Sequence, residues 1–241
     1  MNAWIVPVGA ASAGAGLFAW GACHPAAQLF GPTIRRVGPG DLALTFDDGP
    51  NPAITPGLLD LLDRHRARAT FFLIGRFVDA HPGLAAEIAA RGHVIGNHTA
   101  THPGLVWRSP ARVVDELARC QEAIERATGR RPVWMRPPFG FRGPHLQRLV
   151  RRVGLRGIVM WSVTGYDWNP QPADRLIHRL RRARGGDVIL LHDGWHKAAG
   201  ADRTHTVEAL AAWLPRWRDR GLRLAAVEEP ADIEGGAENA G

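Results

Sequence analysis

Lysine is nearly absent from this 241-residue sequence, and no motif of paired cysteines occurs in it. Lys197 is the only lysine, so the formal net charge of +7 comes almost entirely from arginine. A basic surface attracts anionic partners such as nucleic acid or membranes. The arginines, however, lack the interleaved aromatic residues that single-stranded nucleic-acid grooves require. We therefore expect an arginine-rich solvated surface and no nucleic-acid partner.

Cysteine is equally scarce. Only Cys23 and Cys120 occur, one in an apolar N-terminal segment and the other in an expected helix. A structural disulfide is therefore not expected. Without a Cys-x-x-Cys pair the chain also lacks the usual ligands of a structural zinc site. Lipid attachment at Cys23 is disfavoured, because the preceding Trp20-Gly21-Ala22 is a poor lipidation signal.

Charge is missing from the first 34 residues, which contain no Lys, Arg, Asp or Glu. Residues 3–23 are mostly apolar, and about 20 such residues suffice to span a bilayer. The segment also resembles the core of a signal peptide, although no charged side chain precedes it. A strand or arm docked on the domain is the alternative. We favour membrane insertion or export of this segment, which would make the protein membrane-associated or extracytoplasmic. A cytoplasmic location is the remaining alternative.

From Asp41 onward, short apolar runs alternate with longer amphipathic segments. The expected strands are Leu42–Phe46, Ala69–Ile74, His93–Gly96, Val133–Arg136, Gly157–Trp161, Val188–His192 and Leu222–Val227. The expected helices are Pro56–His65, Pro82–Arg91, Ala111–Thr128, Pro144–Val153, Ala173–Arg184 and Val207–Arg220. Strands that are apolar on both faces indicate a parallel sheet covered by helices. The pattern predicts an α/β fold, a distorted (β/α)7 barrel over residues 35–228, followed by a flexible acidic tail at 229–241.

Polar residues accumulate where these strands end, which is where α/β barrels place their active sites. Asp48 follows the first strand, and His98 and His102 follow the third. Two imidazoles and a carboxylate are a common ligand set for Zn²⁺ or another divalent ion, with positions left open for water and substrate. An H-x-x-x-H pair alone is a weak signal, but its combination with Asp-Asp after a strand predicts a catalytic metal site.

Further ionisable residues at these ends predict acid–base chemistry. Asp47 is free to take a proton from water if Asp48 binds metal, although Asp-Asp-Gly-Pro also suits a simple turn. Arg136 would pair with Asp47, or form an ordinary surface salt bridge. His192 would act as a general acid whose pKa Asp167 raises, or be a satisfied structural histidine.

Three apolar residues are candidates for the wall of the substrate pocket. Trp161, Trp168 and Leu190 stand near these strand ends, where they would line the acyl pocket or stack on a sugar. Core packing explains each of them equally well.

These segments resemble the five motifs of the polysaccharide deacetylase family, the NodB homology domain of carbohydrate esterase family 4. The motifs read T-F-D-D-G-P, H-[ST]-x-x-H, R-x-P-[FY]-G, D-W after an upstream W, and L-x-H. They match, in order, Thr45–Pro50, His98–His102, Arg136–Gly140, Trp161 with Asp167-Trp168, and Leu190–His192.

The resemblance implies specific roles within the barrel. Asp47 would be the base and His192 the acid, with Arg136 and Asp167 orienting them; Asp48, His98 and His102 would hold the metal. The backbone N–H of Phe139 would stabilise the oxyanion. The implied activity is removal of N-acetyl groups from an N-acetylated glycan with Zn²⁺, Co²⁺ or another divalent ion. The alternatives are an amidase or deformylase on the same barrel, and an inactive sugar-binding module that the presence of Asp47 and His192 disfavours. Neither the glycan nor the oligomeric state follows from the sequence.

Overall fold

Parallel pairing of short, apolar strands builds the framework of the computed structural model, which describes residues 5–228. β1 (Asp41–Gly49) lies at the centre, between β2 (Thr70–Leu73) and β7 (Val188–His192). The sheet continues through β3 (Val94–Asn97), β4 (Trp134–Met135) and β5 (Gly157–Ile158) on one side and β6 (Val163–Thr164) on the other, while β8 (Arg223–Ala225) pairs with β1. This is the distorted barrel-like α/β architecture that the sequence predicts.

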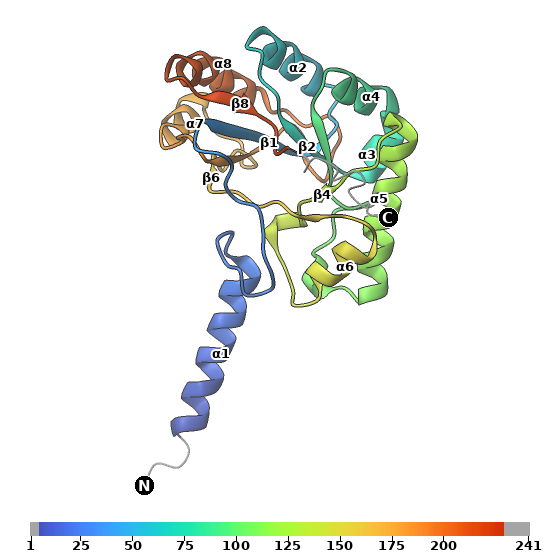
Figure 1. The fold of residues 1–241 in the computed structure, drawn as a ribbon, viewed down its shortest axis with the longest axis vertical. Helices are drawn as coiled ribbons and strands as arrows, with labels where there is room; N and C mark the ends of the chain where they lie inside the picture. The colour runs from blue at the N-terminus through green and yellow to red at the C-terminus, as the bar shows by residue number, and fades with distance from the viewer. Residues whose placement is uncertain (1–4, 229–241) are drawn as a thin grey trace, which may run out of the picture.

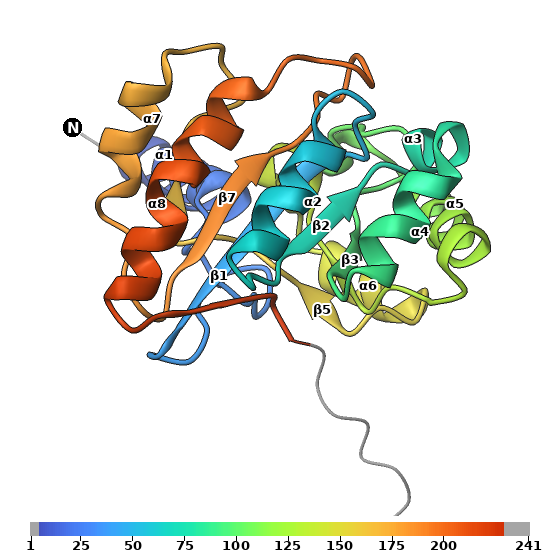
Figure 2. The same cartoon turned by 90° about the horizontal axis from the view of Figure 1, so that it is seen from above.

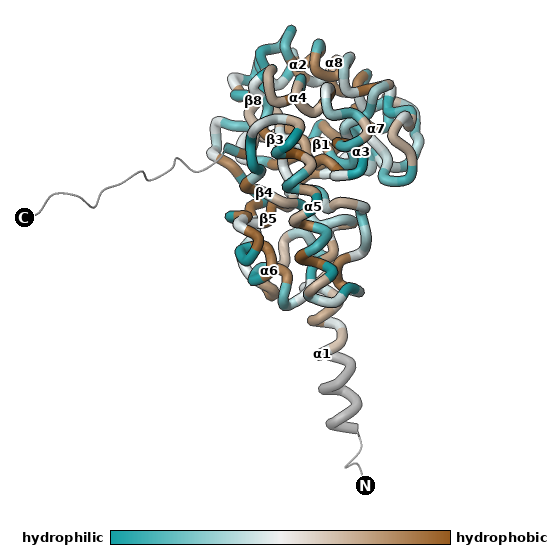
Figure 3. The backbone as a smooth tube through the Cα atoms, turned by 90° about the vertical axis from the view of Figure 1, so that its right-hand side faces the viewer, coloured by the Kyte–Doolittle hydropathy of each residue, from teal (hydrophilic) through white to brown (hydrophobic). Residues whose placement is uncertain are grey.

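Helices cover the outside of the sheet. They are α2 (Thr55–Arg64), α3 (Gly75–Ala80), α4 (Pro82–Ala90), α5 (Pro110–Thr128), α6 (Leu146–Arg152), α7 (Ala173–Leu180) and α8 (Thr204–Asp219), with 3-10 turns at Leu105–Trp107 and Pro138–Gly140. Figure 2 shows α8, α2 and α4 side by side over the strands. Between helices and strands lies a core that includes Leu44, Phe46 and Phe71. In Figure 3 the backbone is coloured by hydropathy, and hydrophobic (brown) stretches lie at β4 and β5. Burial of such apolar surface supplies most of the drive to fold.

Local signals in the sequence explain where a helix begins and ends, as α5 illustrates. The Ser109 side chain accepts a hydrogen bond from the Arg112 N–H at 3.4 Å, and Pro110 occupies the first turn. Gly129 then ends the helix with a φ of 69°, a left-handed conformation that glycine adopts without steric cost. These caps fix α5 against α3 and α4, beside the strands that carry the site.

The expected strand Gly157–Trp161 is wrong in its second half. β5 ends at Ile158, Val159 forms only an isolated bridge to Ile34, and the next strand of the sheet is β6. The carbonyls of Val159 and Met160 instead accept hydrogen bonds from the buried guanidinium of Arg136, at 3.1 and 3.2 Å. A buried arginine must find acceptors for its N–H groups, and here it takes them from backbone that would otherwise continue the strand.

An N-terminal segment fills part of the gap between the two sheet edges. Within residues 5–228, β5 and β6 do not pair with each other. Ile34 instead bridges to Val159 and Arg36 to Asp187, so the chain before β1 runs between the two ends of the sheet. The Ile34 N–H donates to the Ile158 carbonyl at 2.9 Å. The barrel is therefore closed in part by residues that precede its first strand.

The apolar start of the chain is helical. α1 (Ile5–Cys23) projects away from the barrel (Figure 1), so the alternative of an N-terminal strand is wrong for this segment. Arg142 fixes its C-terminal end, donating to the Ala27 carbonyl at 2.9 Å and to the His24 carbonyl at 2.6 Å. No helix in the described part of the chain is both long and apolar enough to traverse a bilayer.

Other expected elements differ from the structure in their presence or their bounds. α3 and β6 have no counterpart among the predicted elements, because each is too short to show a periodicity. α7 ends at Leu180, not at Arg184, since the Asp187 carboxylate accepts the Arg184 N–H at 3.0 Å and turns the chain toward β7. The expected flexible tail at 229–241 lies outside the described residues.

Candidate active site

Two adjacent carboxylates enter one cavity at the end of β1. Side chains of a regular strand alternate between faces, so neighbouring residues would normally point apart. Here the pairing register shifts between Asp47 and Gly49, and Asp48 has a left-handed φ of 72°. As a result both carboxylates are buried and line the same pocket. Local distortion of the strand, which costs conformational energy, thus brings two acidic groups together.

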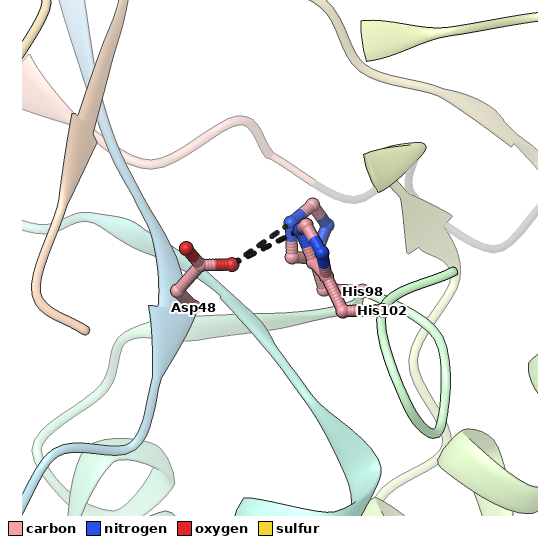
Figure 4. A group of neighbouring side chains, drawn as sticks. All are labelled: Asp48, His98 and His102. Carbon is pink, nitrogen blue, oxygen red and sulfur yellow. Dashed lines mark ion pairs between the residues drawn. The ribbon is translucent and has the colours of Figure 1, made fainter. Parts of the chain in front are cut away.

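Asp48, His98 and His102 form a compact group of possible metal ligands (Figure 4). Asp48 Oδ1 lies 3.2 Å from His102 Nε2 and 3.5 Å from His98 Nε2, and the three ligand atoms are all within 4.8 Å of one another. Among the described residues, this buried Oδ1 has no hydrogen-bond partner. An unsatisfied buried oxygen between two imidazole nitrogens fits a divalent ion, because a cation would satisfy all three atoms.

The charge states of this group also suit a cation. Burial alone would raise the pKa of Asp48, but its contacts with His196 and His98 hold that pKa well below its usual value. Burial, reinforced by the neighbouring His98, lowers the pKa of His102 to about 3. Asp48 is therefore anionic and His102 neutral near neutral pH, the forms in which carboxylate and imidazole bind metals.

Arg136 holds the second carboxylate, as the sequence predicts. Its guanidinium is fully buried, and Nη1 donates to Asp47 Oδ1 at 2.8 Å and to the Thr45 hydroxyl at 2.7 Å. The ring of Phe72 lies 4.3 Å from the guanidinium carbon, so the cation packs against an aromatic face. Asp47 is thereby fixed, while its other oxygen lies 3.8 Å from His98 Nε2, beside the metal ligands.

His192 ends β7, next to Asp47 on the neighbouring strand β1, and is paired with Asp167. Its ring Nδ1 lies 2.9 Å from Asp167 Oδ1. Burial disfavours the charged imidazole, but the adjacent Asp167 outweighs that effect and raises the pKa of His192 to about 9. The imidazole is therefore protonated at neutral pH and can donate a proton.

The remaining predicted residues surround a cavity of about 870 Å³ that contains both carboxylates and His192. Trp161, Trp168, Leu190 and Phe139 all line it, so these side chains form pocket walls. Trp168 and Phe139 are partly exposed, and the Trp168 ring contacts His192 edge to face at 5.6 Å. Leu190 is almost completely buried and also serves the core.

Phe139, whose backbone N–H is the expected oxyanion donor, lies in a tight turn after β4. Phe139 has a left-handed φ of 59°, and the next residue, Gly140, has a φ of 71°. A Cβ on Gly140 would come within 2.6 Å of the Trp161 ring, so glycine is required there by both conformation and space. The turn sets the backbone of Phe139 at the rim of the cavity.

Sequence patterns did not identify the contribution of the segment that follows His192. Trp195, His196 and Arg203 line the cavity, and His196 stacks on His102 with ring centroids 4.4 Å apart. Asp193, also missed, is fully buried, and this burial raises its pKa to about 7 while Asp193 accepts a 2.5 Å hydrogen bond from Thr55. The only available signal was proximity, since His196 follows His192 by four residues.

Comparison with known proteins agrees with this geometry. The polysaccharide deacetylase family profile matches residues 35–158. A chitooligosaccharide deacetylase of Azorhizobium caulinodans is 38% identical over 191 residues, covering 75% of this chain and 90% of its own length. A peptidoglycan-N-acetylglucosamine deacetylase of Bacillus cereus is 36% identical over 190 residues, covering 78% of this chain and 86% of the relative. A solved family 4 carbohydrate esterase from Streptomyces lividans, in complex with acetate, superposes with a TM-score of 0.70 at 32% identity, covering 78% of this chain and 92% of that one.

The fold is an α/β barrel, and acidic and histidine side chains gather at the carboxyl ends of its strands. These features, shared with the solved esterase, are those of a carbohydrate deacetylase. The chain belongs to the polysaccharide deacetylase family.

Proposed function

We propose that the protein is a metal-dependent deacetylase that hydrolyses N-acetyl groups of a GlcNAc-type glycan and releases acetate. The observation that carries the proposal is one cavity in which Asp47, held by Arg136, and His192, held by Asp167, flank the Asp48, His98 and His102 group. A base, an acid and a set of cation ligands are the parts that metal-assisted amide hydrolysis needs.

Asp48, His98 and His102 would hold the divalent ion, for which we propose Zn²⁺, with Co²⁺ as a substitute. Bound there, the ion would act as a Lewis acid toward the acetamide carbonyl and lower the pKa of water. Asp47 would accept the proton of the attacking water, and Arg136 keeps its carboxylate in place at 2.8 Å. Asp47 lies close to this group but need not bind the ion, because Asp48 provides the carboxylate ligand.

The remaining steps use Phe139 and His192, which line the same cavity. The Phe139 N–H would donate to the oxyanion of the tetrahedral intermediate, a type of contact that contributes roughly 2.7–4 kcal/mol in other enzymes. His192, charged at neutral pH because of Asp167, would then protonate the departing nitrogen. The C–N bond breaks, and acetate and a free amino sugar leave. Trp161, Trp168 and Leu190 would enclose the acetyl group and a sugar face.

The two named relatives support a glycan substrate, since one is a chitooligosaccharide deacetylase and the other a peptidoglycan deacetylase. The test is mass spectrometry of chitin oligomers, peptidoglycan fragments, an N-formylated lipid-linked sugar and simple amides after incubation with Zn²⁺-loaded protein. We expect mass losses of one acetyl group per modified sugar from at least one N-acetylated glycan. Hydrolysis of only the formylated sugar or the simple amides would replace the proposal by the amidase alternative.

Two matched variants distinguish catalysis by this protein from the activity of a contaminating enzyme and from activity lost through misfolding. Asp47→Asn should reduce turnover by about 10²–10⁴, because proton transfer by a positioned base contributes that much. Asp41→Asn provides the control, since Asp41 pairs with Arg223 at the opposite end of β1, on the surface. Unchanged turnover in Asp47→Asn would show that another group is the base.

For location we propose export or membrane association through residues 3–23, with residues 35–228 as the catalytic domain. The support is the lack of charged side chains in the first 34 residues. Fractionation of cells that express the full chain tests this, and recovery of the protein in the cytosol alone would overturn it.

A further inference from the structure

The two histidines of the proposed metal group are held in different ways. His98 Nδ1 lies 2.7 Å from the Arg136 carbonyl, so a hydrogen bond fixes its ring and leaves Nε2 facing Asp48. His102 Nδ1 is buried and has no hydrogen-bond partner among the described residues. Metal-binding histidines usually owe their orientation to a hydrogen bond from the second nitrogen. The orientation of His102 must therefore come from other contacts.

Ring packing provides those contacts. The imidazole of His196 lies parallel to that of His102, with centroids 4.4 Å apart and an interplanar angle of 14°. Phe139 meets the His102 ring edge to face at 4.7 Å, and His98 meets it at 4.9 Å. His102 is thus enclosed by three rings, and His196 is the only one of the three that covers a face of the imidazole in parallel. Stacked aromatic pairs attract one another beyond the effect of the area that they bury.

The His196 backbone is itself tied to the site. Its N–H donates to Asp48 Oδ2 at 3.1 Å, so one oxygen of the carboxylate is engaged and Oδ1 is left for the histidines. Its carbonyl accepts a hydrogen bond from Arg76 on α3. Gly194, two residues earlier, packs so closely on β1 that a Cβ would lie 2.1 Å from the Asp48 carbonyl oxygen. The segment therefore has a fixed position beneath the His196 ring.

We propose that His196 is a positioning residue for the metal site: its ring orients His102 by stacking, and its backbone N–H orients Asp48. This inference rests on the proposed function, because it concerns the affinity of the same three-residue group for a divalent ion. The His196 ring is not one of the three ligand groups whose atoms lie within 4.8 Å of one another. Its Nδ1 lies 3.8 Å from Asp48 Oδ2, which is too long for a hydrogen bond. Its role is therefore packing, and an aromatic ring without nitrogen should replace it.

The experiment compares His196→Ala and His196→Phe with the wild-type protein in calorimetric titrations with Zn²⁺. Contacts that orient a metal ligand typically change metal affinity by about 10–100-fold, and we expect a loss of that size for His196→Ala. His196→Phe keeps a ring against His102 and should bind close to the wild-type affinity. His178→Ala is the matched control, because His178 is exposed on α7 outside the active-site cavity.

A second readout separates positioning from ligation. At saturating Co²⁺, the visible absorption bands report the ligand set, and we expect the same bands in the wild type and both variants. A changed spectrum in His196→Phe, or an affinity as low as that of His196→Ala, would show that the imidazole binds the ion and would overturn the inference. Equal affinity of the wild type and His196→Ala would overturn it as well. A wild-type protein that binds neither ion would instead refute the proposed function.

Discussion

Asp167 holds His192 at two points. Its Oδ2 accepts the His192 backbone N–H at 2.8 Å, and its Oδ1 pairs with the ring Nδ1 at 2.9 Å. Thr206 also donates to Oδ2, at 2.9 Å, so the fully buried carboxylate cannot turn away from the imidazole. Orientation and charge of the proposed acid therefore depend on the same side chain.

Asp167→Asn should shift the pH dependence of catalysis downward. In the wild type His192 has a pKa raised to about 9, so the acid is protonated at pH 7 and is lost as pH rises through about 9. Without the negative charge of Asp167, the largest effect that opposes burial is lost, and the pKa of His192 should fall from about 9 while Asp48 and Asp47 continue to raise it. The alkaline limb of kcat/KM should therefore move to lower pH, and activity at pH 7 should fall about tenfold for each pH unit by which the limb passes below pH 7. An alkaline limb that does not move would remove Asp167 from this role.

Arg136→Met should destabilise the fold strongly. The substitution leaves Asp47 buried without the guanidinium that pairs with it. Loss of one partner of a buried ion pair lowers the free energy of unfolding by about 3–5 kcal/mol. Urea denaturation of the metal-free protein measures this difference. Arg91→Met is the control, because the ion pairs of Arg91 with Asp60 and Asp63 are on the surface and should contribute no more than about 1 kcal/mol. Equal effects of the two substitutions would contradict the prediction.

A divalent ion should stabilise the folded protein through Asp48, His98 and His102. Free ion at 100 times its Kd contributes about 2.7 kcal/mol, which corresponds to a rise in Tm of roughly 5–11 °C for a domain of this size. A chelator should reverse the rise in thermal scans. His98→Ala removes one ligand and should abolish most of the shift. Should that variant show the full shift, the ion would be binding elsewhere.

Gly194→Ala should damage the site through the backbone of β1. The added Cβ would lie 2.1 Å from the Asp48 carbonyl oxygen, so the strand end or the segment must move. Overpacking of this kind costs about 1–3 kcal/mol in the free energy of unfolding, and Zn²⁺ affinity should fall with it. Gly200→Ala in the same loop is the control, because a Cβ there meets nothing within 4 Å. Similar affinities in both variants would show that this close contact does not support the site.

Local sequence signals predicted the framework and most of the site. Apolar runs such as Val188–His192 became strands with the expected bounds, because a strand buried on both faces must be apolar throughout. Asp47, Asp48, His98 and His192 can be grouped from their positions after the expected strands. The carboxyl ends of parallel strands meet at one edge, so residues far apart in sequence share a site whenever they follow such strands.

The tertiary structure alone decided what depends on contacts between distant segments. The guanidinium of Arg136 takes the carbonyls of Val159 and Met160, just beyond the end of β5. His196 reached His102 because Gly194 packs against the end of β1. Neither contact can be recognised from a periodicity or a spacing in the sequence. Each depends on hydrogen bonds and packing between segments whose local sequences are unrelated. The sequence thus determined which groups the protein has for its chemistry, with Arg136 and Asp167 as their partners, and the folded structure determined the packing between distant segments that holds them in place.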